Sequence, residues 1–239
     1  MSNEVTETEP IIQYVDGRDG SESAGCVKNM CNPRKFFYRY FALIFMCLLS
    51  FGSYFCYDNP AALQDNFKKD LKISTSTFTQ FYAYYSWPNV VLCFLGGYLI
   101  DRVFGIRLGT IIFSSMVFTG QIVFGLGAYF NHIWLMNAGR FIFGIGGESL
   151  AVAQNTYAVA WFMGKELNLV FGLQLSIARL GSTVNMIVMT PIYDAIGKSG
   201  KSGYECLGTA LLIASATCLF SLICGIILGF LDKRRTHII

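Results

Sequence analysis

Charged residues are scarce in this sequence. Only 14% of the 239 residues are Asp, Glu, Lys or Arg, whereas 54% are hydrophobic and 15% are aromatic. A charged fraction this low excludes an ordinary water-soluble domain, in which about a quarter of the residues are charged. The net charge of +3 is also too small for a surface that binds nucleic acid. We therefore expect a protein of the lipid bilayer, with no nucleic-acid partner.

Metal-binding and catalytic patterns are also missing. The chain has two histidines and eight cysteines but no Cys-x-x-Cys pair and no histidine cluster, so we expect no metal site and no cofactor. Several cysteines fall inside apolar runs, where a thiol packs as a small hydrophobic group. Cys56 and Cys206 fall near one predicted face, and a disulfide between them is an alternative. No nucleophile, base and orienting group occur together, so we expect no enzyme.

The first 35 residues differ from the rest. They are acidic at the start and rich in glycine and serine between Gly17 and Gly25, and such a composition cannot bury enough apolar surface to fold. We expect no cleaved signal peptide, because no basic segment leads into a short apolar core. Residues 1–35 are expected to form a disordered cytosolic tail.

Six segments are long and apolar enough to cross a bilayer, whose core needs about 20 residues of helix. They cover residues 36–57, 77–100, 106–130, 133–161, 167–196 and 204–231. Basic residues cluster before the first segment, between the second and third, and after the fourth and sixth, and such clusters stay on the cytosolic side. We expect an all-α protein with six transmembrane helices and both termini in the cytosol.

A motif lies between the second and third apolar segments. Its defining residues are Gly97, Asp101, Arg102, Gly105 and Arg107. It resembles the loop between the second and third helices of major facilitator transporters, where glycines let two helices approach and an acid and arginines clasp the helix ends as part of gating. Val103 and Phe104 separate Arg102 from Gly105 where the family usually has one residue, so we expect a slightly wider turn.

This resemblance implies a fold. Major facilitator proteins have two six-helix halves around a site at the bilayer midplane, and each half contains two inverted three-helix repeats. Residues 36–231 would form one such half, and residues 232–239 would open the central cytosolic loop. We expect the N-terminal half of a transporter, from a short isoform or an incomplete sequence. A complete six-helix half-transporter is the alternative.

Three charged residues lie deep inside the apolar segments, away from their ends: Arg140, Glu148 and Arg179. A charge within the bilayer is costly unless it meets a partner or water, so each marks a candidate site. Arg140 opens a glycine-rich stretch that resembles the fourth-helix motif of the superfamily, and hydrogen bonding to nearby backbone is its alternative role. Glu148 and Arg179 lie at similar depth near the midplane, at about 1.5 Å of rise per residue. We expect both to face one cavity.

A carboxylate and a guanidinium at one level suit a zwitterion. Glu148 would hold the ammonium group of a peptide, and the planar fork of Arg179 would hold its carboxylate. Trp87, Asn89 and Gln154 are deep enough in their segments to line the same pocket, although tryptophan is more often an interface anchor. A plain salt bridge between Glu148 and Arg179, which only locks the bundle, is the alternative.

Longer stretches narrow the resemblance. Residues 50–63, 85–107, 139–162 and 164–186 are similar to the lysosomal dipeptide transporters of animals. This resemblance implies facilitated diffusion of dipeptides from the lysosomal lumen to the cytosol, with Glu148 and Arg179 where the peptide termini are held. It also implies a heavily glycosylated single-pass accessory protein as a partner. The chain fits such a partner because it has no Asn-x-Ser/Thr glycosylation site of its own.

The tail contains a candidate sorting signal. Glu7, Ile11 and Ile12 resemble an acidic dileucine-type sorting signal with isoleucine at its first hydrophobic position. We therefore expect a multi-pass protein of the lysosomal membrane.

Two other functions stay open from the sequence. One is a transporter of another small organic solute, such as a sugar or nucleoside, although paired charges at the midplane favour a zwitterion. The other is a half-length chain that transports nothing and acts as a partner-binding subunit.

Overall fold

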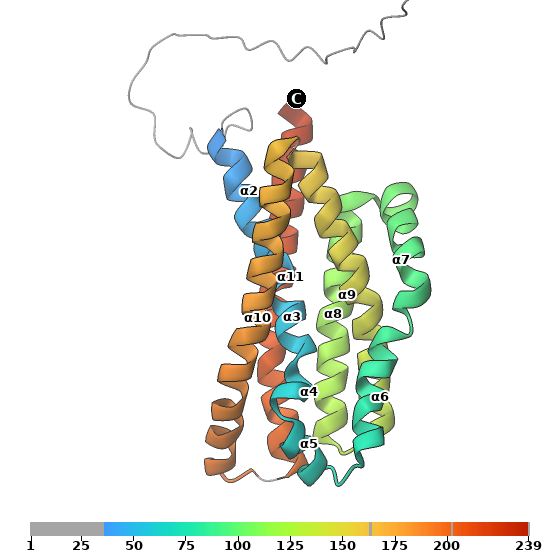
Figure 1. Ribbon diagram of the computed structural model, residues 1–239, viewed down its shortest axis with the longest axis vertical. Coiled ribbons are helices and arrows are strands. Elements are labelled where there is room, and N and C mark those ends of the chain that lie inside the picture. The colour runs from blue at the N-terminus through green and yellow to red at the C-terminus, as the bar shows by residue number, and fades with distance from the viewer. Residues whose placement is uncertain (1–35, 163, 202, 239) are drawn as a thin grey trace, which may run out of the picture.

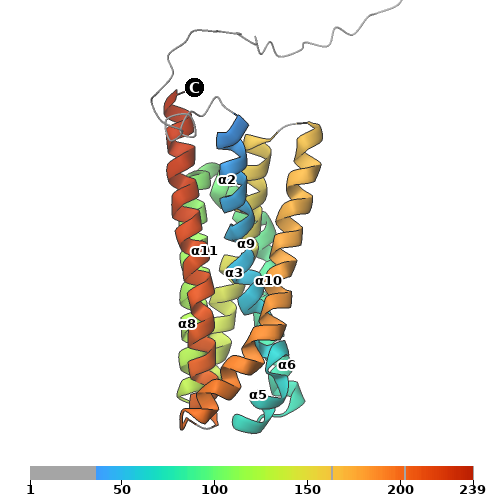
Figure 2. The same cartoon turned by 90° about the vertical axis from the view of Figure 1, so that its left-hand side faces the viewer.

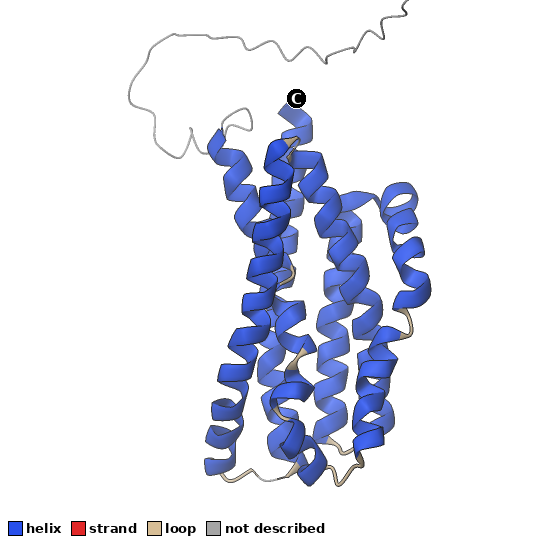
Figure 3. Ribbon diagram, in the orientation of Figure 1, coloured by secondary structure: helices blue, strands red, loops and turns tan. Residues whose placement is uncertain are grey.

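Helices dominate the molecule. The computed structural model describes residues 36–162, 164–201 and 203–238, and this part contains helix and loop but no strand (Figure 3). In chain order the elements are α2 (Phe36–Leu49), α3 (Phe51–Tyr57), α4 (Asn59–Ala62), α5 (Gln64–Asp70), α6 (Thr75–Ser86), α7 (Asn89–Tyr98), the π-helical turn η1 (Leu99–Phe104), α8 (Gly105–Tyr129), α9 (Ile133–Trp161), α10 (Lys165–Lys198) and α11 (Tyr204–Ile238). The all-α prediction is confirmed, whereas the predicted tail at residues 1–35 lies outside the described residues.

The long helices run side by side as an elongated bundle (Figures 1 and 2). The start of α2, the passage from α9 to α10 and the end of α11 lie at one end of it, and α5 and the passage from α10 to α11 lie at the other (Figure 1). The basic clusters after the fourth and sixth segments therefore fall at one end, together with the start of α2. This arrangement agrees with the positive-inside pattern and makes that end the candidate cytosolic face.

In the described part of the chain, four stretches of helix are long and apolar enough to cross a membrane. They are Tyr38–Tyr57, Gly96–Tyr129, Glu166–Lys198 and Tyr204–Thr236. Helix α9 has 29 residues and therefore sufficient length, but it carries Arg140 and Glu148 and several amides. The segment formed by α6 and α7 is interrupted and begins with polar residues. These two are the predicted spans that length and composition alone do not recover.

Two of the predicted helices are broken. The first divides at Ser50, between α2 and α3, and the second divides at Trp87 and Pro88, between α6 and α7. Pro88 lacks the backbone donor that a continuous helix needs, which accounts for the break in the second segment. Both breaks lie midway along the bundle, where they bring irregular backbone next to α9.

Close helix contacts depend on glycines. Helix α8 packs most extensively against α9, and α11 packs against α8. A Cβ atom at Gly120 would lie 2.6 Å from the backbone nitrogen of Phe143, and one at Gly139 would lie 2.5 Å from that of Phe124. Only glycine allows the α8 and α9 backbones to come this near, as membrane helices that associate through small residues do.

The C-terminal helix is longer than predicted. Residues 232–238 continue α11 instead of opening a loop. The Arg107 guanidinium donates to the Asp232 carboxylate, with 2.6 Å between Nε and Oδ2, and the Tyr38 hydroxyl donates to the Leu231 carbonyl at 2.8 Å. These contacts satisfy polar groups in the last turns, so the helix continues past the apolar segment that the sequence delimits.

Candidate functional site

Glu148 and Arg179 line one cavity. Glu148 comes from the middle of α9 and Arg179 from the middle of α10, and α3 and α6 contribute the other lining residues. The cavity has a volume of about 230 Å³, and its lining consists of Ser53, Tyr54, Tyr57, Tyr85, Gly147, Glu148, Ala151 and Arg179. The two charges that the sequence places at similar depth therefore share one space.

Glu148 is half-buried and has one hydrogen-bond donor. The Tyr85 hydroxyl donates to its Oε1 at 3.1 Å. Tyr85 itself packs against the Tyr57 ring, with 4.7 Å between ring centroids and 58° between ring planes, so a tilted aromatic contact holds the phenol in place. Among the described residues nothing donates to the second carboxylate oxygen, which leaves it available to a ligand.

Arg179 is exposed toward the cavity and has no carboxylate partner. Its guanidinium carbon lies 5.5 Å from the centroid of the Tyr54 ring, within the range of a cation–π contact. The ion pairs in the described part of the chain are Arg39 with Glu166 and Arg107 with Asp232. The structure therefore presents the carboxylate and the guanidinium separately, without the salt bridge that was the alternative.

We call Tyr54 and Tyr57 the aromatic wall of this cavity. The sequence did not predict that these two side chains would line a binding site. Tyr54 and Tyr57 fall near the end of the first apolar segment, where tyrosine usually anchors a helix at the interface. Helix α3, which follows the break at Ser50, instead packs against α10 and α11, and its Tyr54 and Tyr57 side chains line the cavity with Glu148 and Arg179. The spacing of three residues between Tyr54 and Tyr57 puts both on one helical face, which was the available signal.

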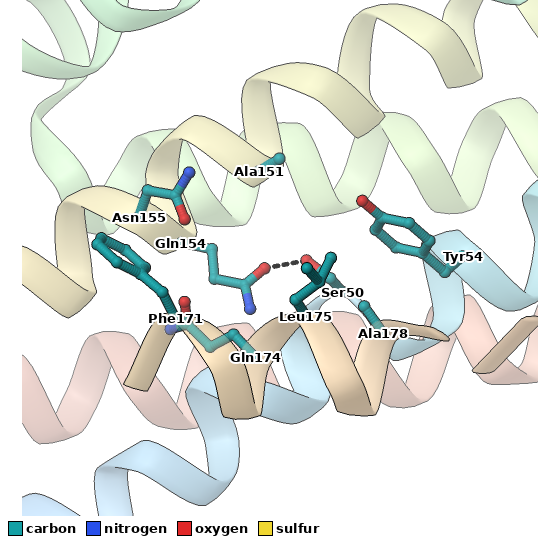
Figure 4. Close-up of a pocket in the computed structure, with 9 residues that line it drawn as sticks. All are labelled: Ser50, Tyr54, Ala151, Gln154, Asn155, Phe171, Gln174, Leu175 and Ala178. Atoms are coloured by element: carbon teal, nitrogen blue, oxygen red, sulfur yellow. Dashed lines mark hydrogen bonds between the residues drawn. The ribbon is translucent and has the colours of Figure 1, made fainter. Parts of the chain in front are cut away.

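A second cavity adjoins the first and is shown in Figure 4. Its volume is about 340 Å³, and it is lined by Ser50, Tyr54, Ala151, Gln154, Asn155, Phe171, Gln174, Leu175 and Ala178. Gln154 is buried here, donates to the Met46 carbonyl at 2.9 Å, and accepts from the Ser50 hydroxyl. The helix break therefore exposes a backbone carbonyl that fixes Gln154 at the cavity wall.

Trp87 and Asn89 line neither of these two cavities. Trp87 is 67% exposed and stacks near Tyr84, with ring centroids 5.6 Å apart. Asn89 is half-buried, and its buried carbonyl oxygen has no hydrogen-bond donor among the described residues. The break at Pro88 displaces both side chains from the Glu148 cavity, so their binding role remains a prediction.

Arg140 lies in the core. Only 1% of it is exposed, and its guanidinium carbon lies 4.3 Å from the Phe124 ring centroid and 5.6 Å from that of Phe143. One of its nitrogens donates to the Tyr57 carbonyl at 3.4 Å. Arg140 therefore contacts backbone and aromatic faces, and it supports the α3 segment that contributes Tyr54 and Tyr57 to the cavity.

The loop motif forms a π-helical turn. Asp101 and Arg102 lie in η1, which ends at Gly105 with a φ of 69° and a ψ of 161°, a conformation open to glycine but not to other residues. One extra residue in a helix is commonly accommodated as a π turn, which agrees with the wider turn expected from Val103 and Phe104. The Asp101 side chain lies outside the described part, so its gating role stays untested.

The remaining motif residues have different surroundings. A Cβ at Gly97 would have nothing within 4 Å among the described atoms, whereas one at the neighbouring Gly96 would lie 3.0 Å from the Ser149 hydroxyl oxygen. The expected close approach is thus made by Gly96, because it is the residue that faces α9. Arg107 binds Asp232 of α11, a partner that the motif gives no means of predicting.

Other sequence predictions concern cysteines, metals and sorting. Cys56 and Cys206 are both free, and their thiols donate to the carbonyls of Ala214 and Tyr193. No cluster of metal-ligating side chains occurs in the described ranges. The sorting residues Glu7, Ile11 and Ile12 lie outside those ranges, so their role stays a prediction.

The chain is similar to proteins of known class. The Major Facilitator Superfamily matches residues 43–238. A protein of Danio rerio named lysosomal dipeptide transporter MFSD1 is 66% identical over 211 residues, which are 88% of this chain and 46% of the relative. Proteins of the same name from Homo sapiens and Gallus gallus are 59% and 50% identical, covering 93% and 98% of this chain and 48% and 49% of theirs.

The family match extends from within α2 to the end of α11. The chain spans about half the length of the curated relatives it matches. Its helical bundle is consistent with half of a two-half transporter fold. With a family match over residues 43–238 and this helical architecture, the chain belongs to the Major Facilitator Superfamily.

Proposed function

We propose that this chain forms the N-terminal half of a lysosomal membrane transporter that moves dipeptides from the lumen to the cytosol by facilitated diffusion. The proposal rests on one observation. Glu148 and Arg179 line the same cavity, and no salt bridge joins them. The named relatives supply the substrate class, and the cavity supplies a chemistry that suits it.

The cavity can recognise both ends of a dipeptide. A peptide ammonium group brings three donors, and the free oxygen of Glu148 accepts one of them while Tyr85 keeps the carboxylate oriented. A peptide carboxylate can accept two parallel bonds from Arg179, whose guanidinium is held against the Tyr54 face. Charge-assisted bonds of this kind are about twice as strong as neutral ones. A sugar or nucleoside would leave both charges unpaired.

The second half of the transporter would complete the site. Glu148 and Arg179 both open toward a cavity on the α3, α9 and α10 side, and α10 is the candidate span with the smallest buried share. Inverted halves rocking about a shared midplane site expose it alternately to the two compartments. Release to the cytosol needs no enzyme chemistry and no cofactor in this scheme.

Dipeptide flux tests the assignment. A chimera is made from residues 1–239 and the second half of the Danio rerio relative, whose matching region is 66% identical, and is reconstituted in proteoliposomes. Glu148→Gln and Arg179→Ala should each lower flux about a hundredfold, because each removes one partner of a desolvated charge pair.

Matched controls are available at the far end of the bundle. Glu205→Gln and Lys198→Ala change the same charges in the first turn of α11 and the last turn of α10, and flux should stay within twofold. Wild-type flux in Glu148→Gln and Arg179→Ala would contradict the proposal. Glucose or uridine flux that survives while dipeptide flux is absent would support the other-solute alternative.

We also propose lysosomal residence directed by the tail, together with a glycosylated single-pass partner. Replacing both Ile11 and Ile12 by alanine in the chimera should move most of it to the cell surface, because both hydrophobic positions of the signal are lost. Surface biotinylation measures the change, and Val5→Ala in the same tail is the control. Unchanged colocalisation with lysosomal membrane would show that the sorting signal lies elsewhere in the protein.

A further inference from the structure

The second cavity continues the first along α9 and α10. Tyr54 and Ala151 line both. On α9 the lining proceeds from Glu148 to Gln154, and on α10 it proceeds from Arg179 back to Gln174, so it lies toward the end of the bundle where α9 passes into α10 (Figure 1). We call this space the amide cavity, after the Gln154, Asn155 and Gln174 side chains on its wall (Figure 4). A molecule held by Glu148 and Arg179 would lie directly beside it.

Gln174 is buried in the amide cavity without a partner. Only 4% of the residue is exposed, and neither Nε2 nor Oε1 has a hydrogen-bond partner in the described part of the chain. Buried side-chain amides are nearly always hydrogen-bonded, and each exception needs an explanation. Gln174 lines a cavity of about 340 Å³, which is large enough to admit a small polar group.

Gln154 makes the contrast clear. It is buried to a similar degree, at 5% exposed, but both ends of its amide are satisfied by Met46 and Ser50. The helix break at Ser50 therefore accounts for Gln154 as a structural group. No such contact accounts for Gln174, although the two glutamines line the same cavity.

The lining also limits the kind of group that would bind. No Asp, Glu, Lys, Arg or His side chain is among the nine residues that line the amide cavity, and Phe171 and Leu175 give it an apolar wall. A charged group placed there would lose hydration without gaining an opposite charge. An amide can both donate and accept, so the cavity fits an uncharged side chain that makes hydrogen bonds.

We propose that the amide cavity receives one side chain of the transported dipeptide and that Gln174 selects for an uncharged, hydrogen-bonding one. The inference rests on the proposed function, because Glu148 and Arg179 must hold the peptide termini next to this cavity. Gln174 is then a specificity-determining residue, separate from the two residues that hold the termini.

The test compares dipeptides that differ in one side chain of similar size. Flux of Ala-Asn is compared with that of Ala-Leu, and flux of Asn-Ala with that of Leu-Ala, in the chimera described above. Gly-Gly, which has no side chain, reports on terminal recognition alone. The wild-type chimera should favour the asparagine member in one of the two orders, and that order identifies the peptide residue whose side chain enters.

Gln174→Met keeps the side-chain volume and removes both hydrogen-bonding atoms. The asparagine-to-leucine flux ratio should fall about tenfold, the effect of one neutral hydrogen bond, while Gly-Gly flux stays within twofold. Ser176→Ala is the control on the same helix, because the Ser176 hydroxyl is exposed and bonds to the Gly172 carbonyl of its own helix at 2.8 Å. Thermal stabilisation of the purified chimera by the same dipeptides gives a second readout that does not require flux.

A second variant tests the direction of selection. Gln174→Glu adds a negative charge to the cavity and should raise the flux of Ala-Lys or Lys-Ala relative to the matching asparagine dipeptide. The inference is overturned if Gln174→Met leaves both asparagine-to-leucine ratios unchanged, because Gln174 then faces only water. Failure of the proposed function gives a different result, since Glu148→Gln would then leave Gly-Gly flux intact.

Discussion

Two pairs of charged side chains in this molecule have opposite surroundings. Arg107 and Asp232 are bonded at 2.6 Å, and Asp232 also accepts from the Trp161 indole at 3.0 Å. Glu148 and Arg179 line one cavity, but no bond joins them. The first pair ties the start of α8 to the ends of α9 and α11. The members of the second pair are not bonded to each other; Glu148 accepts from Tyr85 and Arg179 lies over the Tyr54 ring.

The difference separates structural charges from binding charges. A buried charge whose hydrogen bonds are complete has nothing left to offer a ligand, and its removal leaves its partner uncompensated. A charged group that faces a cavity and still has unused hydrogen-bonding atoms can exchange water for a ligand. The same residue types thus stabilise the bundle at its end and, in the function that we propose, recognise a solute at its middle.

The largest effect is expected when the second half of the transporter, which would complete the site, is absent. The 239-residue chain alone should insert into the membrane but give no dipeptide flux above that of protein-free liposomes, because a two-half site needs both halves. Flux is measured in liposomes that contain only this chain. The same chain co-expressed with the second half of the Danio rerio relative is the control, and robust flux from the short chain by itself would favour a self-assembling half-transporter.

The next test compares the two acids, Asp232 and Glu148. The distinction between them fails if their replacement lowers the free energy of unfolding equally. Asp232→Ala in the chimera should lower the free energy of unfolding by about 2 to 3 kcal/mol, because Arg107 and the Trp161 indole both lose their acceptor. Glu148→Gln should change it by less than about 1 kcal/mol, since one bond from Tyr85 is at stake. Thermal unfolding of the purified protein measures both.

Asp194 provides the control for that experiment. It is exposed near the opposite end of α10, and its carboxylate has no hydrogen-bond or ion-pair partner in the described part of the chain, so Asp194→Ala should leave the unfolding temperature unchanged. A loss for Glu148→Gln as large as that for Asp232→Ala would assign Glu148 to the framework.

The smallest effect is expected at the other ion pair. Arg39 and Glu166 are bonded at 2.9 Å, but their side chains are 36% and 42% exposed. Solvent screens such pairs, so Arg39→Gln should cost less than about 1 kcal/mol of unfolding free energy. Glu166→Gln should cost no more than Arg39→Gln, because Arg39→Gln also removes the guanidinium contact with the Phe162 ring at 4.8 Å. A loss equal to that of Asp232→Ala would show that pairing alone, and not burial, determines stability here.

The helical architecture was predictable from the sequence because apolar length is a one-dimensional property. Segments bounded by charged or turn residues were located to within a few residues. The predicted end of the last helix was wrong because Asp232 and Thr236 are satisfied by Arg107, which lies more than a hundred positions earlier. A partner so distant in the chain leaves no local pattern.

The charged pair was also predictable in part. Depth along a helix follows from counting residues, so Glu148 and Arg179 could be placed at one level. Their common cavity depended in addition on the rotation of α9 and α10, and the aromatic wall depended on the break at Ser50. Trp87 and Asn89 matched in depth but lie beyond the break at Pro88, on neither cavity wall.

Composition, apolar periodicity and the placement of basic residues were enough to determine a helical membrane protein, the order of its segments and the depth of its charges. These are properties of each segment by itself. Only the tertiary structure decided that Arg107 is paired while Arg179 is free, and that Gln154 is satisfied while Gln174 is not. The reason is physical, because a hydrogen bond depends on which atoms the packing of different helices brings within about 3 Å. The sequence of one segment alone does not determine that distance.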